Sequence, residues 1–234
     1  MPKLLTRIFG IFLLFVLLTV GFIYFFKNEP LPMAVPTEEA DELATKMLDA
    51  LGHEAYTNTR YLEWSYRNGN HQYLWDKTMG IVDVSWDETV VHLNLNSTEK
   101  SEVIKDGIAI DGDQKIKLAK KALSYFNNDS FWLVGPFKVF DEGTTRAIVT
   151  TEEGKTRLLV TYTKGGDTPG DSYLWLLDES GIPESFKMWV QILPLKGQEA
   201  SWEGWHRMET GVLLPQYHRI GPLKLDMGTV KAYN

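Results

Sequence analysis

Residues 60–76 read RYLEWSYRNGNHQYLWD, and the alternation within this stretch sets the fold class. Leu62, Trp64 and Tyr66 alternate with polar residues, which is the period of a strand that buries one face. A turn at residues 68–70 then leads into a second run of the same kind. The stretch therefore predicts a β-hairpin with one aromatic face.

The alternation continues over most of the remaining chain. Two segments instead have a helical period, residues 37–51 and 114–127. Further strands are expected over residues 82–86, 91–95, 131–133, 138–140, 146–151, 156–163, 172–177, 185–193 and 202–210. We therefore predict an α+β, mainly β domain, with more strands than a flat sheet usually contains. Its expected form is one strongly curved antiparallel sheet, an incomplete barrel, with two helices packed on it.

Several of these strands place a large aromatic side chain on the predicted inner face. Such side chains suit a cavity for a lipid or another hydrophobic ligand, and they equally suit the filling of a thick core. The candidate ligand-lining residues are Trp64, Tyr66, Trp75, Trp86, Tyr162, Tyr173 and Trp175.

The N-terminal segment differs from the rest in composition. Residues 8–26 contain no charge, and as a helix they measure about 28 Å, enough to cross a bilayer. The segment ends in bulky residues where a signal peptidase needs small ones, so we expect it to be retained. Lys3 and Arg7 precede it, which places the N-terminus in the cytoplasm. We therefore predict one transmembrane helix in the bacterial cytoplasmic membrane, with the domain in the periplasm.

The chain is thus expected to have three parts. Residues 1–27 form a transmembrane signal-anchor, residues 28–36 a proline-rich linker, and residues 37–234 a single extracytoplasmic domain. The three prolines of the linker favour an extended spacer that holds the domain just off the membrane.

Charge and cysteine content exclude several kinds of function. The formal net charge of −7, with no basic stripe, disfavours a nucleic-acid partner. The absence of cysteine excludes disulfides, thiolate metal sites and a lipid-modified N-terminal cysteine. Any attachment to a membrane must then come from the peptide itself.

No pattern in the sequence is typical of a catalytic or metal site. The five histidines are not spaced as metal ligands, and no Gly-x-Ser-x-Gly element is present. We therefore expect no metal, no cofactor and no enzymatic activity.

Four segments resemble a known group of proteins. They are Thr59–Trp64, Tyr73–Asp76, Asn128–Leu133 and Leu174–Pro183. Together they are similar to uncharacterised exported bacterial proteins related to the lipoprotein carrier and outer-membrane lipoprotein-sorting superfamily. The resemblance implies an unclosed β-barrel with helices over its opening, and a concavity that binds lipoprotein acyl chains or other hydrophobic molecules.

A retained anchor separates this chain from the mobile carriers of that superfamily, because a shuttle must leave the membrane. The leading hypothesis is a membrane-anchored binding module for a lipid, an acyl chain or another hydrophobic ligand. The first alternative is a structural protein of the cell envelope, with a core filled by its own side chains and a protein partner docked outside. The second alternative is a hydrolase.

Overall fold

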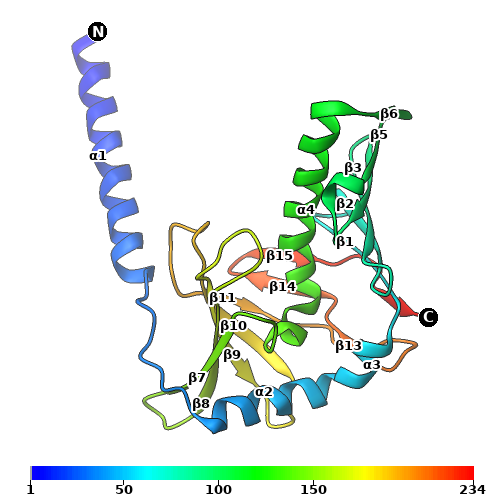
Figure 1. The fold of residues 1–234 in the computed structure, drawn as a ribbon. Helices are drawn as coiled ribbons and strands as arrows, with labels where there is room; N and C mark the ends of the chain where they lie inside the picture. The colour runs from blue at the N-terminus through cyan, green and yellow to red at the C-terminus, as the bar shows by residue number, and fades with distance from the viewer. Residues whose placement is uncertain (1) are drawn as a thin grey trace.

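The computed structural model describes residues 2–234, and Figure 1 shows the course of the chain. Met1 and several side chains of the first helix lie outside the described part. The side chain of Lys3, on which the predicted orientation partly depends, is one of them.

The aromatic hairpin is the start of the larger sheet. In this hairpin Trp64 of the first strand lies opposite Tyr73 of the second. The seven strands of the sheet, in spatial order, are β16 (Lys231–Tyr233), β1 (Tyr61–Tyr66), β2 (His71–Asp76), β3 (Ile81–Trp86), β4 (Thr89–Asn94), β5 (Glu102–Lys105) and β6 (Ile108–Ile110). All neighbours are antiparallel, as the alternation predicts.

The second large sheet is built from the later strands. Its five strands, in spatial order, are β11 (Gln198–Ser201), β10 (Pro183–Trp189), β9 (Ser172–Leu177), β8 (Thr156–Tyr162) and β7 (Thr144–Thr150). This sheet too is antiparallel. The prediction of an antiparallel, mainly β domain without a closed barrel is confirmed, but the strands form two large sheets where one was expected.

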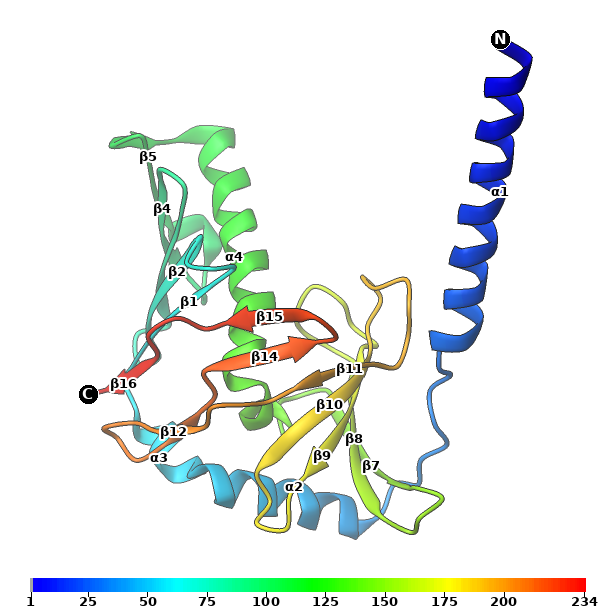
Figure 2. The same cartoon turned by 180° about the vertical axis from the view of Figure 1, so that it is seen from behind.

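A hairpin of β14 (Tyr217–Ile220) and β15 (Leu223–Asp226) lies between the two large sheets. Tyr217 forms a bridge with Glu203, just beyond β11, and the Met227 carbonyl accepts a hydrogen bond from Ser65 N of β1 at 3.0 Å. A third pair, β12 (His206–Arg207) and β13 (Leu213–Leu214), replaces most of the strand expected over residues 202–210. The hairpin thereby connects the sheets into one bent surface (Figure 2).

Helix α4 (Gly112–Val134) lies against this bent surface, and the 3₁₀ turn η2 (Gly135–Lys138) follows it. The predicted strand at residues 131–133 is therefore wrong, and so is the strand at 138–140. Short apolar runs fit a buried helix as well as a strand, and here Phe126, Leu133 and Val134 continue the buried face of the helix. The predicted helix is longer by seven residues at its C-terminal end as a result.

Helix α2 (Glu38–Leu51) covers the end of the five-stranded sheet, with contacts to β7 and β8. Its buried residues are Ala40, Ala44, Met47, Leu48 and Leu51, as the period predicts. Gly52, with φ of 79°, ends the helix, and the short helix α3 (His53–Asn58) follows at once. A further 3₁₀ turn, η1 (Thr98–Lys100), precedes β5.

Helix α1 (Pro2–Lys27) stands apart from both sheets (Figures 1 and 2). Among the described residues, no helix combines the length and the hydropathy of a membrane span. The transmembrane anchor therefore stays a prediction.

The linker contacts the domain directly. Val35 pairs with Ile148 of β7, and Ala34 packs on the outer face of the five-stranded sheet, on Val149, Leu159, Leu174 and Trp189. The linker, predicted as an extended spacer, is thereby attached to the five-stranded sheet.

Candidate functional site

Helix α4 places an aromatic face against the concave side of the bent surface. Asp111 caps its start by accepting a hydrogen bond from Gly112 N at 2.8 Å. Further along, Phe126 faces the seven-stranded sheet, while Phe131 and Trp132 face the five-stranded sheet. The helix thereby fills much of the concavity that the sequence predicts.

Four of the candidate ligand-lining residues lie on the seven-stranded sheet. Trp64 stacks on Tyr73 with ring centroids 4.6 Å apart, and the Trp75 ring lies 5.1 Å from that of Phe126. Trp86 meets Tyr125 of α4 edge to face at 5.4 Å. Tyr66 is buried, as are Trp64 and Trp86, and Trp75 is partly buried.

The other three candidates lie on the five-stranded sheet. Tyr162 and Tyr173 surround the Phe131 ring, at 5.6 and 4.6 Å. Trp175 is fully buried and packs edge to face on Phe186 at 5.1 Å. The structure thus brings the seven candidates together as two groups, one on each side of α4, and not as a single lining.

Several of these residues carry a buried polar atom without a hydrogen-bond partner. Among the seven candidates, the atoms are Trp64 Nε1, Trp75 Nε1, Trp175 Nε1 and Tyr162 Oη. Trp202 Nε1 is a further unpaired donor, and His218 Nε2 also has no hydrogen-bond partner. Buried donors in folded proteins are rarely left unpaired, and each one costs about 1–3 kcal/mol. The interior therefore offers unused donors to a group that can accept hydrogen bonds.

His218 of β14 is fully buried beside Trp202, with ring centroids 4.5 Å apart. Its Nδ1 lies 3.0 Å from the Ser201 carbonyl, which fixes the proton on Nδ1. Burial lowers the pKa of His218 to about 4, so the ring is neutral at pH 7. Its Nε2 is consequently an acceptor next to the Trp202 indole.

A separate polar cluster joins β2 to α4. Asp129 Oδ2 lies 2.6 Å from His71 Nδ1 and accepts a hydrogen bond from Tyr73 Oη at 2.6 Å. Asn128 Nδ2 donates to the other carboxylate oxygen at 2.7 Å. Burial and the Asp129 charge raise the pKa of Tyr73, so its phenol stays protonated as a donor.

This cluster bears on the hydrolase alternative. A carboxylate that orients a histidine is two-thirds of a nucleophilic triad. Within the described residues, however, His71 has no serine, threonine or lysine as a hydrogen-bond partner. Among the described residues, the arrangement connects α4 to β2 and brings no serine, threonine or lysine into hydrogen-bond contact with His71.

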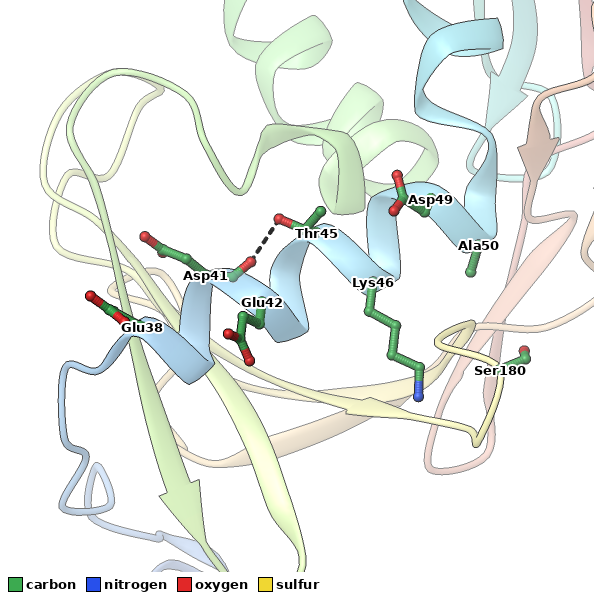
Figure 3. A pocket seen from close by; sticks show the side chains of 8 residues that line it. All are labelled: Glu38, Asp41, Glu42, Thr45, Lys46, Asp49, Ala50 and Ser180. Carbon is green, nitrogen blue, oxygen red and sulfur yellow. Dashed lines mark hydrogen bonds between the residues drawn. The ribbon is translucent and has the colours of Figure 1, made fainter.

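The pockets on the surface of the described residues include two with different linings. The larger, of about 780 Å³, follows the exposed face of α2 (Figure 3). Its carboxylates are those of Glu38, Asp41, Glu42 and Asp49, and Lys46 crosses it to donate to the Glu179 carbonyl at 2.8 Å. The smaller, of about 300 Å³, is lined in part by Trp64 and Tyr73. An acidic groove is unsuited to an acyl chain, so the larger pocket is not the predicted site.

The described residues contain no group of three His, Cys, Asp or Glu side chains that could hold a metal ion. Several residues with an evident structural or chemical role were not predicted as site residues from the sequence. They are His71, Tyr73, Asp129, Trp202 and His218. Asp129 stands between the predicted helix over residues 114–127 and the predicted strand over residues 131–133, and no local signal indicates its partner far away in the chain.

Comparisons with known proteins add little to this geometry. No protein-family model matches the chain, and no curated protein matches it closely. The crystal structure of a DUF1329 family protein from Desulfovibrio piger ATCC 29098 is similar, with 9% identity, coverage of 85% of this chain and 93% of that chain, and a TM-score of 0.44. Similarity at this level is too weak to transfer a fold family or a function, so the resemblance to the lipoprotein carriers stays a prediction.

Proposed function

We propose that this chain is a membrane-anchored binding module that holds a lipid, an acyl chain or another hydrophobic ligand between its sheets. The observation that carries the proposal is the set of unpaired buried donors at Trp64, Trp75, Tyr162 and Trp175. An apolar ligand with ester or amide carbonyl groups would contact the rings on one or both sides of α4 and accept the hydrogen bonds of the donors there. Purely hydrocarbon packing would leave each donor unpaired at a cost of about 1–3 kcal/mol.

The exposed surface of α1 supports the anchor. Large apolar side chains are exposed on every face of its described part: Leu5, Ile8, Phe9, Ile11, Phe12, Leu13, Leu14, Phe15, Val16, Leu17 and Leu18. A helix that is apolar all round is stable in a bilayer or in a core, and not as an isolated element in water. We place it in the bacterial cytoplasmic membrane, with the N-terminus in the cytoplasm and the domain in the periplasm. Protease added to spheroplasts tests this: a protected domain would contradict the orientation.

A helix lying over a bent antiparallel surface is compatible with the lipoprotein-carrier superfamily. In that superfamily, an anchored member would act as a stationary receptor and not as a shuttle. The envelope protein with a self-filled core is the competing proposal, and the close aromatic contacts of α4 favour it. The two differ in whether the interior ever contains a ligand.

Native mass spectrometry of the full chain, purified from its host, separates these proposals. We expect the protein to retain one bound ligand per chain, seen as a single added mass, after detergent and annular lipid have been removed. The double variant Trp64→Phe/Trp175→Phe keeps two aromatic rings and loses two donors, so it should lose most of that mass. Trp205→Phe is the matched control, because Trp205 Nε1 already donates to the Pro183 carbonyl at 2.9 Å. A wild-type chain that is empty in every preparation would support the structural protein instead.

A further inference from the structure

The loop between β10 and β11, residues 190–197, carries exposed apolar side chains. It reads VQILPLKG and contains no acidic residue. Ile192 in this loop is 68% exposed, and Pro194, two residues later, is exposed as well. A single exposed isoleucine is ordinary on a protein surface, so its meaning depends on where the loop lies.

Internal hydrogen bonds hold the loop in this shape. Lys196 Nζ donates to the carbonyls of Val190 and Leu193, at 2.6 and 3.1 Å. Gln191 N donates to Asp171 Oδ1 at 2.9 Å, which attaches the loop to its neighbour between β8 and β9. The Lys196 side chain therefore binds the backbone of its own loop, while the Ile192 side chain is exposed to solvent.

The loop is joined to the end of α1. Lys196 N donates to Asn28 Oδ1 at 2.9 Å, and Glu29 N donates to the Lys196 carbonyl at 3.1 Å. Because α1 ends at Lys27, these contacts begin one residue beyond the helix. Figures 1 and 2 both show the loop beside this end of α1, rising toward the same side as the helix.

We propose that the β10–β11 loop is a second membrane-contact element, which inserts Ile192 into the outer interface of the bilayer beside α1. The inference rests on the proposed anchoring by α1, since a spanning helix that ends at Lys27 places residue 28 at the membrane surface. The loop bound to Asn28 then lies at the same depth. Two contacts with the membrane, joined by a fixed linker, hold the domain in one orientation, whereas a helix and a free spacer would let it turn.

The absence of cysteine permits a direct test by single labelling. Full-length Ile192→Cys and Pro194→Cys are labelled with a polarity-sensitive fluorophore and reconstituted into vesicles of phosphatidylethanolamine and phosphatidylglycerol. Met79→Cys is the matched control, because Met79 is an apolar side chain with 59% exposure on the turn between β2 and β3. That turn lies at the end of the sheet where Tyr61 pairs with Tyr233, near the C-terminus and far from α1 (Figure 2).

We expect the labels at 192 and 194 to shift to the blue and to be quenched by lipids that carry a shallow spin label, while the label at 79 behaves as in water. Flotation of the vesicles shows, in the same samples, whether the chain is bound to the membrane through α1. If the chain floats with the vesicles but the labels at 192 and 194 show the emission of a label in water, the loop proposal is wrong and the anchor is unaffected. A chain that does not float would overturn the anchor, and the loop proposal with it.

Discussion

Trp189 Nε1 donates a hydrogen bond to the Glu29 carbonyl at 2.9 Å, across 160 residues of sequence. The Glu29 carboxylate also contacts Lys187 Nζ at 2.7 Å. Both partners lie on β10, so the linker after α1 is attached to the same strand that leads into the proposed membrane loop. The end of α1 is therefore connected to the five-stranded sheet through Glu29.

Trp189→Phe should release the linker without unfolding the domain. The substitution removes one hydrogen bond and keeps an aromatic ring, so we expect a loss of about 1 kcal/mol in unfolding free energy. Amide exchange at Glu29 and Val35, measured by mass spectrometry, should accelerate while the protection of β9 stays unchanged. Trp205→Phe serves as the control and should leave the linker amides as they are. Equal linker exchange in wild type and Trp189→Phe would contradict the attachment.

The extent to which sequence predicts this fold depends on whether the deciding contacts are local. Leu62, Trp64 and Tyr66 alternate in burial as the pattern requires, because strand period and hairpin turn are local properties. The pairing of Val35 with Ile148 has no local signal, because the three prolines of the linker favour an extended backbone without indicating which strand it contacts.

The candidate site shows the same division. The sequence identifies the aromatic side chains that face inward, since alternation alone assigns a face. It does not show that α4 continues through Phe131 and separates these side chains into two groups. Nor does it pair Asp129 with His71, 58 residues earlier in the chain, because a polar residue between two predicted elements gives no indication that it is buried.

Asp129→Ala should destabilise the domain strongly. Asp129 is 1% exposed, and its removal leaves both His71 Nδ1 and Tyr73 Oη without their acceptor. Each buried donor left without an acceptor costs about 1–3 kcal/mol, so the loss of both hydrogen bonds should cost about 2–6 kcal/mol. Tyr73→Phe deletes only one donor to the carboxylate and should cost about 1.5–3 kcal/mol. Urea denaturation of the full chain in detergent measures both, and a loss below that of Tyr73→Phe would contradict a structural role for the carboxylate.

Gly181→Ala should be costlier than an ordinary glycine substitution in a turn. Gly181 has φ of 100°, and a Cβ atom there would lie 2.9 Å from the Lys46 carbonyl of α2. The left-handed conformation alone costs about 1–2 kcal/mol for alanine. Gly69→Ala is the matched control, because Gly69 has φ of 85° with nothing within 4 Å. The melting temperature should fall further for Gly181→Ala, and an equal fall would mean that α2 moves aside without cost.

His218 should make stability depend on pH between about 4 and 6.5. Burial lowers its pKa from 6.5 to about 4, so within this range the unfolded chain binds a proton that the folded chain does not. The free energy of unfolding therefore falls as the pH falls through this window, by about 3 kcal/mol in total from this residue. His218→Gln retains a donor for the Ser201 carbonyl and cannot titrate, so its stability should lack this part of the decline. Urea denaturation at pH 7 and pH 4.5 measures the difference between the two chains, and parallel losses in both would show that His218 is protonated in the folded state.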